Sequence, residues 1–159
     1  MEYTFVGRRG SVARDQGLLN QALSFLEAGS RCAAQISLTP RKFRTPLVPA
    51  IVCYAFAVEL YLKLLLVLSK VDFKKEHRLE LLFGLLPAST QDDLTKAYGD
   101  PSLAKDLAEV GSAFVVWRYE HEYEQIGIDP RILLAVADAC HRVVRTIAPN
   151  LLVFGENSI

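Results

Sequence analysis

The sequence predicts an all-α protein, built as an up-down bundle of four to six helices. Apolar residues recur in several separate segments at the i, i+3, i+4, i+7 spacing of one helix face. The clearest set is Leu19, Ala22, Leu23 and Leu26. No segment alternates apolar and polar residues between hairpin turns, as a half-buried strand does. Proline and glycine stand between the apolar segments, where they end helices.

Length and composition agree with one domain of ordinary size. The chain has 159 residues, of which 51% are hydrophobic, enough for a substantial core and too many for a disordered chain. We expect a flexible arm over residues 1–10, a single helical-bundle domain over 11–149 and a tail over 150–159. The 18 Lys and Arg residues balance 18 Asp and Glu residues. This balance excludes a generally basic nucleic-acid binder and leaves room for a local basic face.

The first expected helix spans Ser11–Ile36, and Gly29 and Ser30 weaken it enough to favour a kink there. A connector over Thr39–Pro49 follows, with three prolines and the basic run Arg41-Lys42-Phe43-Arg44.

The central helix is expected over Leu47–Ser69 and is almost entirely apolar. Glu59 and Lys63 interrupt it at i,i+4 positions, where the two side chains can pair. Because each charge is costly in a bilayer, we interpret this helix as the buried core of a bundle and not as a membrane span.

Four further helices complete the prediction. They are a short helix over His77–Leu86, one capped by Ser89 or Thr90, one over Ser102–Trp117, and a last one with Asp129 as N-cap and Pro130 at its first position, ending near Ala148. The last two expected helices are separated by a loop rich in Tyr, Glu and His.

Several enzyme and cofactor signatures are absent from the sequence. It contains no glycine-rich phosphate loop, no zinc-ligand spacing and no nucleophile elbow, so we expect no metal and no cofactor. Cys32, Cys53 and Cys140 are odd in number and far apart. They predict reduced thiols in a cytoplasmic protein, and the N-terminus does not look like a signal peptide.

The densest polar cluster follows the fifth expected helix. Arg118 either caps that helix, while Tyr119 packs on a neighbouring one, or lines a small pocket with Tyr119 and His121. Such a pocket suits a phosphate or a base, since arginine binds phosphate in a fork and tyrosine stacks on bases.

Two other clusters have open interpretations. His77 stands beside Lys74, Lys75 and Arg78 at either a solvated helix start or an anion-binding one. Glu59 and Lys63 form either a lone ion pair or a pair that holds a partner such as His77 or Arg118, because a buried pair needs such partners.

The last expected helix has a mostly basic stripe. It consists of Arg131, His141, Arg142 and Arg145, together with Asp138. The opposite side holds Leu133, Val136, Cys140, Val143 and Ile147. The stripe is either the solvated face of an amphipathic helix or a contact face for RNA or nucleotide.

Three segments together resemble the HEPN family. They are Ala55-Phe56-Ala57-Val58-Glu59-Leu60-Tyr61-Leu62-Lys63-Leu64-Leu65-Leu66, then Glu76-His77-Arg78-Leu79-Glu80-Leu81-Leu82-Phe83, then Phe114-Val115-Val116-Trp117-Arg118-Tyr119 with Glu120 and Glu122 just beyond. The resemblance covers roughly residues 50–125. It implies a helical bundle, usually a homodimer, that binds nucleotide or RNA, often in toxin–antitoxin or phage-defence systems.

The chain departs from the family at two points. Many HEPN proteins are metal-independent endoribonucleases with an Arg-x(4–6)-His motif, whereas only two residues separate Arg118 from His121 here. Arg78 stands where the family pattern has Asp or Asn after the histidine.

We therefore expect a module that binds nucleotide, RNA or a partner protein without the usual nuclease activity. One alternative is a purely structural interaction subunit. The other is a nuclease with a variant site in which His121 moves the 2′-hydroxyl proton, Arg118 stabilises the developing charge, and Glu122 or Glu120 orients His121.

Overall fold

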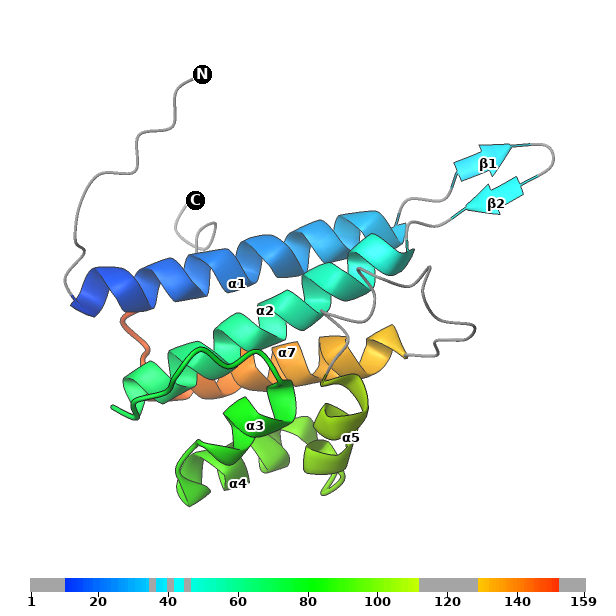
Figure 1. The fold of residues 1–159 in the computed structure, drawn as a ribbon. Coiled ribbons are helices and arrows are strands. Elements are labelled where there is room, and N and C mark those ends of the chain that lie inside the picture. The colour runs from blue at the N-terminus through cyan, green and yellow to red at the C-terminus, as the bar shows by residue number, and fades with distance from the viewer. Residues whose placement is uncertain (1–10, 35–36, 40–41, 45–46, 112–128, 152–159) are drawn as a thin grey trace.

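The computed structural model describes residues 11–34, 37–39, 42–44, 47–111 and 129–151. It confirms the all-α bundle. The elements are α1 (Ser11–Ala34), β1 (Ser37–Thr39), β2 (Lys42–Arg44), α2 (Leu47–Leu68), α3 (Leu79–Gly84), α4 (Ala88–Tyr98), α5 (Leu103–Val110) and α7 (Pro130–Ile147). Three long helices, α1, α2 and α7, lie side by side, and the three short helices α3, α4 and α5 gather on one side of them (Figure 1).

Helix α2 is the centre of the core. It packs against α1 on one side and α7 on another (Figure 1), and thirteen of its residues are buried, including Tyr61 and Glu59. The helix is long and apolar enough to cross a membrane. However, 67% of its most apolar 18-residue stretch is buried inside the bundle. The core helix of a bundle has these same properties, so the feature is weak evidence for a membrane span.

A close approach between α1 and α2 explains Gly29. A Cβ atom at Gly29 would lie 2.6 Å from Cε1 of Tyr54 and 3.1 Å from the carbonyl oxygen of Ala50. Helix α1 continues through this position to Ala34. Gly29 and Ser30 therefore do not end the helix, and the glycine makes room for the Tyr54 ring.

The connector between α1 and α2 contains a small hairpin, which the sequence analysis missed. Strands β1 and β2 pair antiparallel, with Leu38 opposite Phe43. Helix α1 is described to Ala34, and the last two residues of the expected helix, 35–36, lie outside the described residues. Each strand has three residues, too few for alternation to be recognised in the sequence.

Two of the short helices start elsewhere than predicted. Helix α3 begins at Leu79, two residues after His77. The reason is that Oε1 of Glu76 accepts the backbone N–H groups of His77 and Arg78, both at 2.9 Å, so these residues form a turn before the helix. Helix α4 begins at Ala88 after Pro87, with no capping side chain.

The fifth helix is described from Leu103 to Val110, and its expected inner residues Leu103, Leu107 and Val110 are all buried. Ser102 and Gly111 flank the helix as its caps, and residues 112–117 of the predicted helix lie outside the described residues.

The last helix confirms its predicted start. The Asp129 side chain accepts the backbone N–H of Arg131 at 2.9 Å, and Pro130 occupies the first helical position. The predicted inner face is buried apart from Ile147, which is 43% exposed. Beyond the helix, Leu151 is buried, so the first part of the expected tail packs on the bundle.

Candidate functional site

The candidate site is built around the carboxylate of Glu59 on α2. Glu59 is only 1% exposed, although it is acidic, and the other residues of its helix are almost all apolar. Its Oε1 atom accepts hydrogen bonds from Nζ of Lys63, at 2.6 Å, and from Nδ1 of His77, at 3.0 Å. The Lys63 side chain is 15% exposed and that of His77 is 57% exposed, so the cluster extends from the core to the surface. We call these three residues the Glu59 cluster.

Two different elements position the two partners of Glu59. Lys63 is one turn after Glu59 on α2, which places both side chains on one helix face. His77 comes from the turn before α3, and Glu76 fixes that turn through the two backbone N–H groups. Those two hydrogen bonds hold the pKa of Glu76 below its usual range. Of the two interpretations left open for the Glu59–Lys63 pair, the contacts agree with the one in which the pair has His77 as a partner.

The second carboxylate oxygen of Glu59 stands out. Among the residues that the structure describes, Oε2 of Glu59 is buried without a hydrogen-bond partner. A buried polar atom without a partner costs about 1–3 kcal/mol, and more when it carries charge. Lys63 and His77 therefore both compensate the carboxylate through one oxygen, and the cluster depends on keeping both of them in place.

Exposed basic residues stand close to His77 in the sequence. Lys74 and Lys75 are exposed, and Arg78 is 62% exposed. Glu76 compensates part of this charge, with its Oε1 at 3.7 Å from Nε of Arg78. Asp72 and Glu80 belong to the same stretch, so residues 72–80 carry three Lys or Arg and three Asp or Glu side chains. The stretch has no net positive charge, but its exposed Lys74, Lys75 and Arg78 can each contact an anionic ligand.

Nothing in the described part of the chain forms a metal site, since no group of three or more His, Cys, Asp or Glu side chains is arranged to hold an ion.

The basic stripe on α7 does not form one open surface. The Arg142 guanidinium donates to the carbonyl oxygen of Ala97 on α4 at 2.6 Å and pairs with Asp138 at 2.8 Å. Arg145 donates to the Leu151 carbonyl oxygen at 2.9 Å. These contacts join α7 to α4 and hold the segment after α7 against the helix. Neither the solvated face nor the RNA-contact face expected for the stripe included this structural role.

The two remaining basic residues of the stripe are also bound. Arg131 is 88% exposed but pairs with Asp129, the residue that caps its own helix. His141 lies with its Nδ1 atom 3.0 Å from the hydroxyl of Tyr61. The described contacts therefore favour a structural role for the stripe over an RNA-contact face.

Tyr61 is a polar core residue that the sequence analysis did not single out. It is fully buried on α2, and burial is the main reason that its pKa is raised well above 10. Its contact with His141 joins α2 to α7. The available signal was a hydroxyl group within a helix predicted to be buried, because such groups need a partner.

Four other predicted site residues, Arg118, Tyr119, His121 and Glu122, lie outside the described residues.

Comparisons of the chain with protein-family models, with curated proteins and with solved structures give no match.

Proposed function

We propose that this protein is a HEPN-like helical module that binds nucleotide or RNA through the Glu59 cluster and the exposed basic residues beside it. The observation that carries the proposal is the shared Oε1 atom of Glu59, which holds Lys63 and His77 together where the core meets the surface. Lys63 stands in the first and His77 in the second of the three segments that resemble the family.

The cluster leaves one nitrogen of His77 available to a ligand. A carboxylate can only accept hydrogen bonds, so Nδ1 of His77 carries the proton that points to Glu59. The other ring nitrogen, Nε2, belongs to a side chain that is 57% exposed. When the ring is protonated, Nε2–H is a charged donor, and such donors bind phosphate oxygens well.

The proposal does not include the ribonuclease activity of many family members. The Arg-x(4–6)-His spacing is missing from the sequence. The Glu59 cluster contains a single histidine, and an acid–base reaction on RNA usually needs a second group that transfers a proton. A binding role needs only the charged donors.

A binding titration with two His77 variants tests this proposal. A fluorescein-labelled single-stranded RNA is titrated with the wild-type protein, with H77A and with H77N, and fluorescence anisotropy is measured. Asparagine retains a donor near the position of Nδ1 but lacks the outer nitrogen, so H77N keeps Glu59 paired and removes only the ligand contact. We expect both variants to weaken RNA binding about tenfold or more, the value of one charged hydrogen bond.

The control is R31A, which removes an exposed cation on α1 whose partner is Glu27 one turn earlier. We expect R31A to bind RNA like the wild type. A wild-type protein that binds neither RNA nor ATP would contradict the proposal and favour the interaction-subunit alternative. Equal RNA affinity of wild type and H77N would remove the Glu59 cluster from the binding site.

Two further variants, chosen from the sequence, extend the binding titration. R118A and Y119F are expected to weaken RNA or nucleotide binding without unfolding the protein, as the family resemblance implies for these positions.

A further inference from the structure

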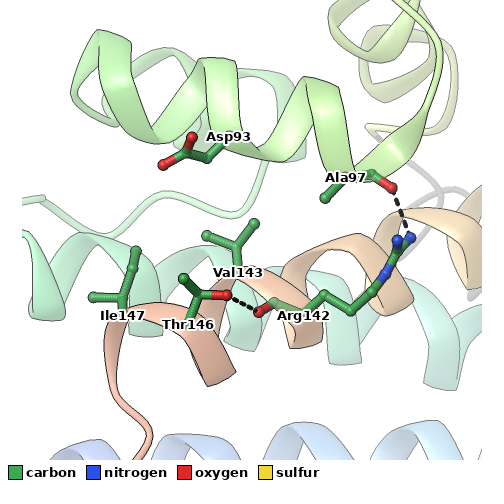
Figure 2. Close-up of a pocket in the computed structure, with 6 residues that line it drawn as sticks. All are labelled: Asp93, Ala97, Arg142, Val143, Thr146 and Ile147. Carbon is green, nitrogen blue, oxygen red and sulfur yellow. Dashed lines mark hydrogen bonds between the residues drawn. The ribbon is translucent and has the colours of Figure 1, made fainter.

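A pocket lies between α4 and α7, on a part of the molecule separate from the Glu59 cluster. Its lining residues are Asp93, Ala97, Arg142, Val143, Thr146 and Ile147, and its volume is about 220 Å³. Figure 2 shows Asp93 on α4 facing Val143 and Ile147 of α7, while the Arg142 guanidinium reaches Ala97 at the other end. Pockets for drug-sized molecules start at about 300 Å³, so this one suits a smaller ligand.

The apolar part of the pocket comes from α7. Val143 is 6% exposed and forms part of the core, whereas Ile147 is 43% exposed. Ile147 is one of a few large apolar side chains on the described surface that are this accessible. A ligand with an apolar body would cover it and gain the free energy of removing apolar surface from water.

The polar part of the pocket favours a cation. The Arg142 guanidinium is already compensated, because one of its nitrogens contacts both the Ala97 carbonyl oxygen and the Asp138 carboxylate. That carbonyl belongs to the last turn of α4, the negative end of the helix. By contrast, no described cation or hydrogen-bond donor contacts the exposed carboxylate of Asp93. The uncompensated charge of the pocket is therefore negative.

We propose that this pocket binds a small organic ammonium ion with an apolar body. The ammonium group pairs with Asp93, and the body lies on Val143 and Ile147. The Arg142 guanidinium keeps its hydrogen bond to Ala97 and its ion pair with Asp138, and it forms the end wall of the pocket. This site is independent of the proposed RNA-binding role, since it shares no residue with the Glu59 cluster.

The test compares three probes of the same shape and different charge. Phenethylammonium, 2-phenylethanol and phenylacetate are titrated separately into ¹⁵N-labelled protein, and the amide resonances are followed by NMR. We expect phenethylammonium to shift the amides of residues 93, 97 and 143–147, with a Kd of about 1 mM. We expect the neutral probe to bind more weakly and the anion to give no saturable shift.

Two neighbouring aspartates supply the variant and its control. Asp92 and Asp93 are both exposed, but of the two only Asp93 lines the pocket. We expect D93N to weaken phenethylammonium binding about two- to fivefold, as an exposed ion pair would, and D92N to leave it unchanged.

A second pair of variants tests the apolar contact. Ile147 and Leu134 are both exposed apolar residues of α7, and of these Ile147 lines the pocket. I147N should weaken binding of both the ammonium and the neutral probe, whereas L134N should not.

Three results would each overturn the proposal. These are the absence of saturable shifts at these amides, equal binding of phenylacetate and phenethylammonium, and equal effects of D93N and D92N.

Discussion

The buried ion pair of the Glu59 cluster gives the sharpest prediction about stability. The chain contains a matched control, since Glu27 and Arg31 form a pair with the same i,i+4 spacing on α1. The side chains of that control pair are 63% and 75% exposed, whereas those of Glu59 and Lys63 are 1% and 15% exposed. Replacing the cation of each pair by methionine therefore compares one interaction in two environments.

We expect K63M to destabilise the protein far more than R31M. Removing one partner of a buried pair costs about 3–5 kcal/mol, because it leaves an uncompensated charge. His77 remains on the same oxygen of Glu59, so we place K63M near the lower end, at about 3 kcal/mol. Removing one partner of an exposed pair costs about 0.5 kcal/mol or less.

Urea unfolding followed by circular dichroism measures both values. A loss of about 3 kcal/mol moves the midpoint by about 1–2 M urea for a protein of this size. A double variant, E59M with K63M, removes the buried charge as well, and we expect it to recover at least half of the loss. If K63M costs no more than R31M, or if the double variant is less stable than K63M, the buried-charge reasoning is wrong.

Three further predictions concern the packing and the helix cap. G29A places a Cβ 2.6 Å from an aromatic ring and should cost about 1–3 kcal/mol in urea unfolding, whereas G84A, with open space around it, should be tolerated. Burial raises the pKa of the Cys140 thiol to about 12, so iodoacetamide should label Cys140 only in denaturant, whereas Cys32 and Cys53 are half-buried; labelling of Cys140 in the native protein would contradict the packing. Hydrogen bonds from Arg131 lower the pKa of Asp129 below its usual range. The stability that Asp129 contributes is present above its unfolded-state pKa and is lost as the pH falls through its folded-state pKa. In D129N, the melting temperature should therefore decrease less at acid pH than in the wild type.

Local spacing explains which parts of the structure could be predicted. Glu59 and Lys63 are one helical turn apart, and Asp129 followed by Pro130 marks a helix start, so both features follow from a few adjacent residues. The apolar run of α2 likewise predicts burial without any knowledge of its neighbours. His77 was one of two possible partners named for the Glu59–Lys63 pair, because a buried charge pair needs such partners.

Contacts between distant residues explain what could not be predicted. Arg142 meets Ala97 across 45 residues, and Tyr61 meets His141 across 80. Periodicity places these side chains on a helix face, but it does not say which other helix that face meets. The basic stripe on α7 was therefore interpreted as solvated or as binding RNA, whereas its described contacts join parts of the bundle.

The start of α3 also could not be predicted from the sequence. A run of Lys, Glu, His and Arg before an apolar helix gives no indication that Glu76 binds two backbone N–H groups and delays the helix to Leu79. The two-residue shift matters for the site, because it puts His77 in a turn from which its ring reaches Glu59.

The most direct test of the proposed function follows the His77 ring itself during ligand binding. The chain has three histidines, so their Cε1–H signals can be resolved by ¹H–¹³C NMR and assigned with single substitutions. If nucleotide or RNA binds at the Glu59 cluster, adding AMP or a short RNA shifts the His77 signal in a saturable way, while the His141 signal, from the ring at Tyr61, stays in place. An unchanged His77 signal at saturating RNA would contradict the account.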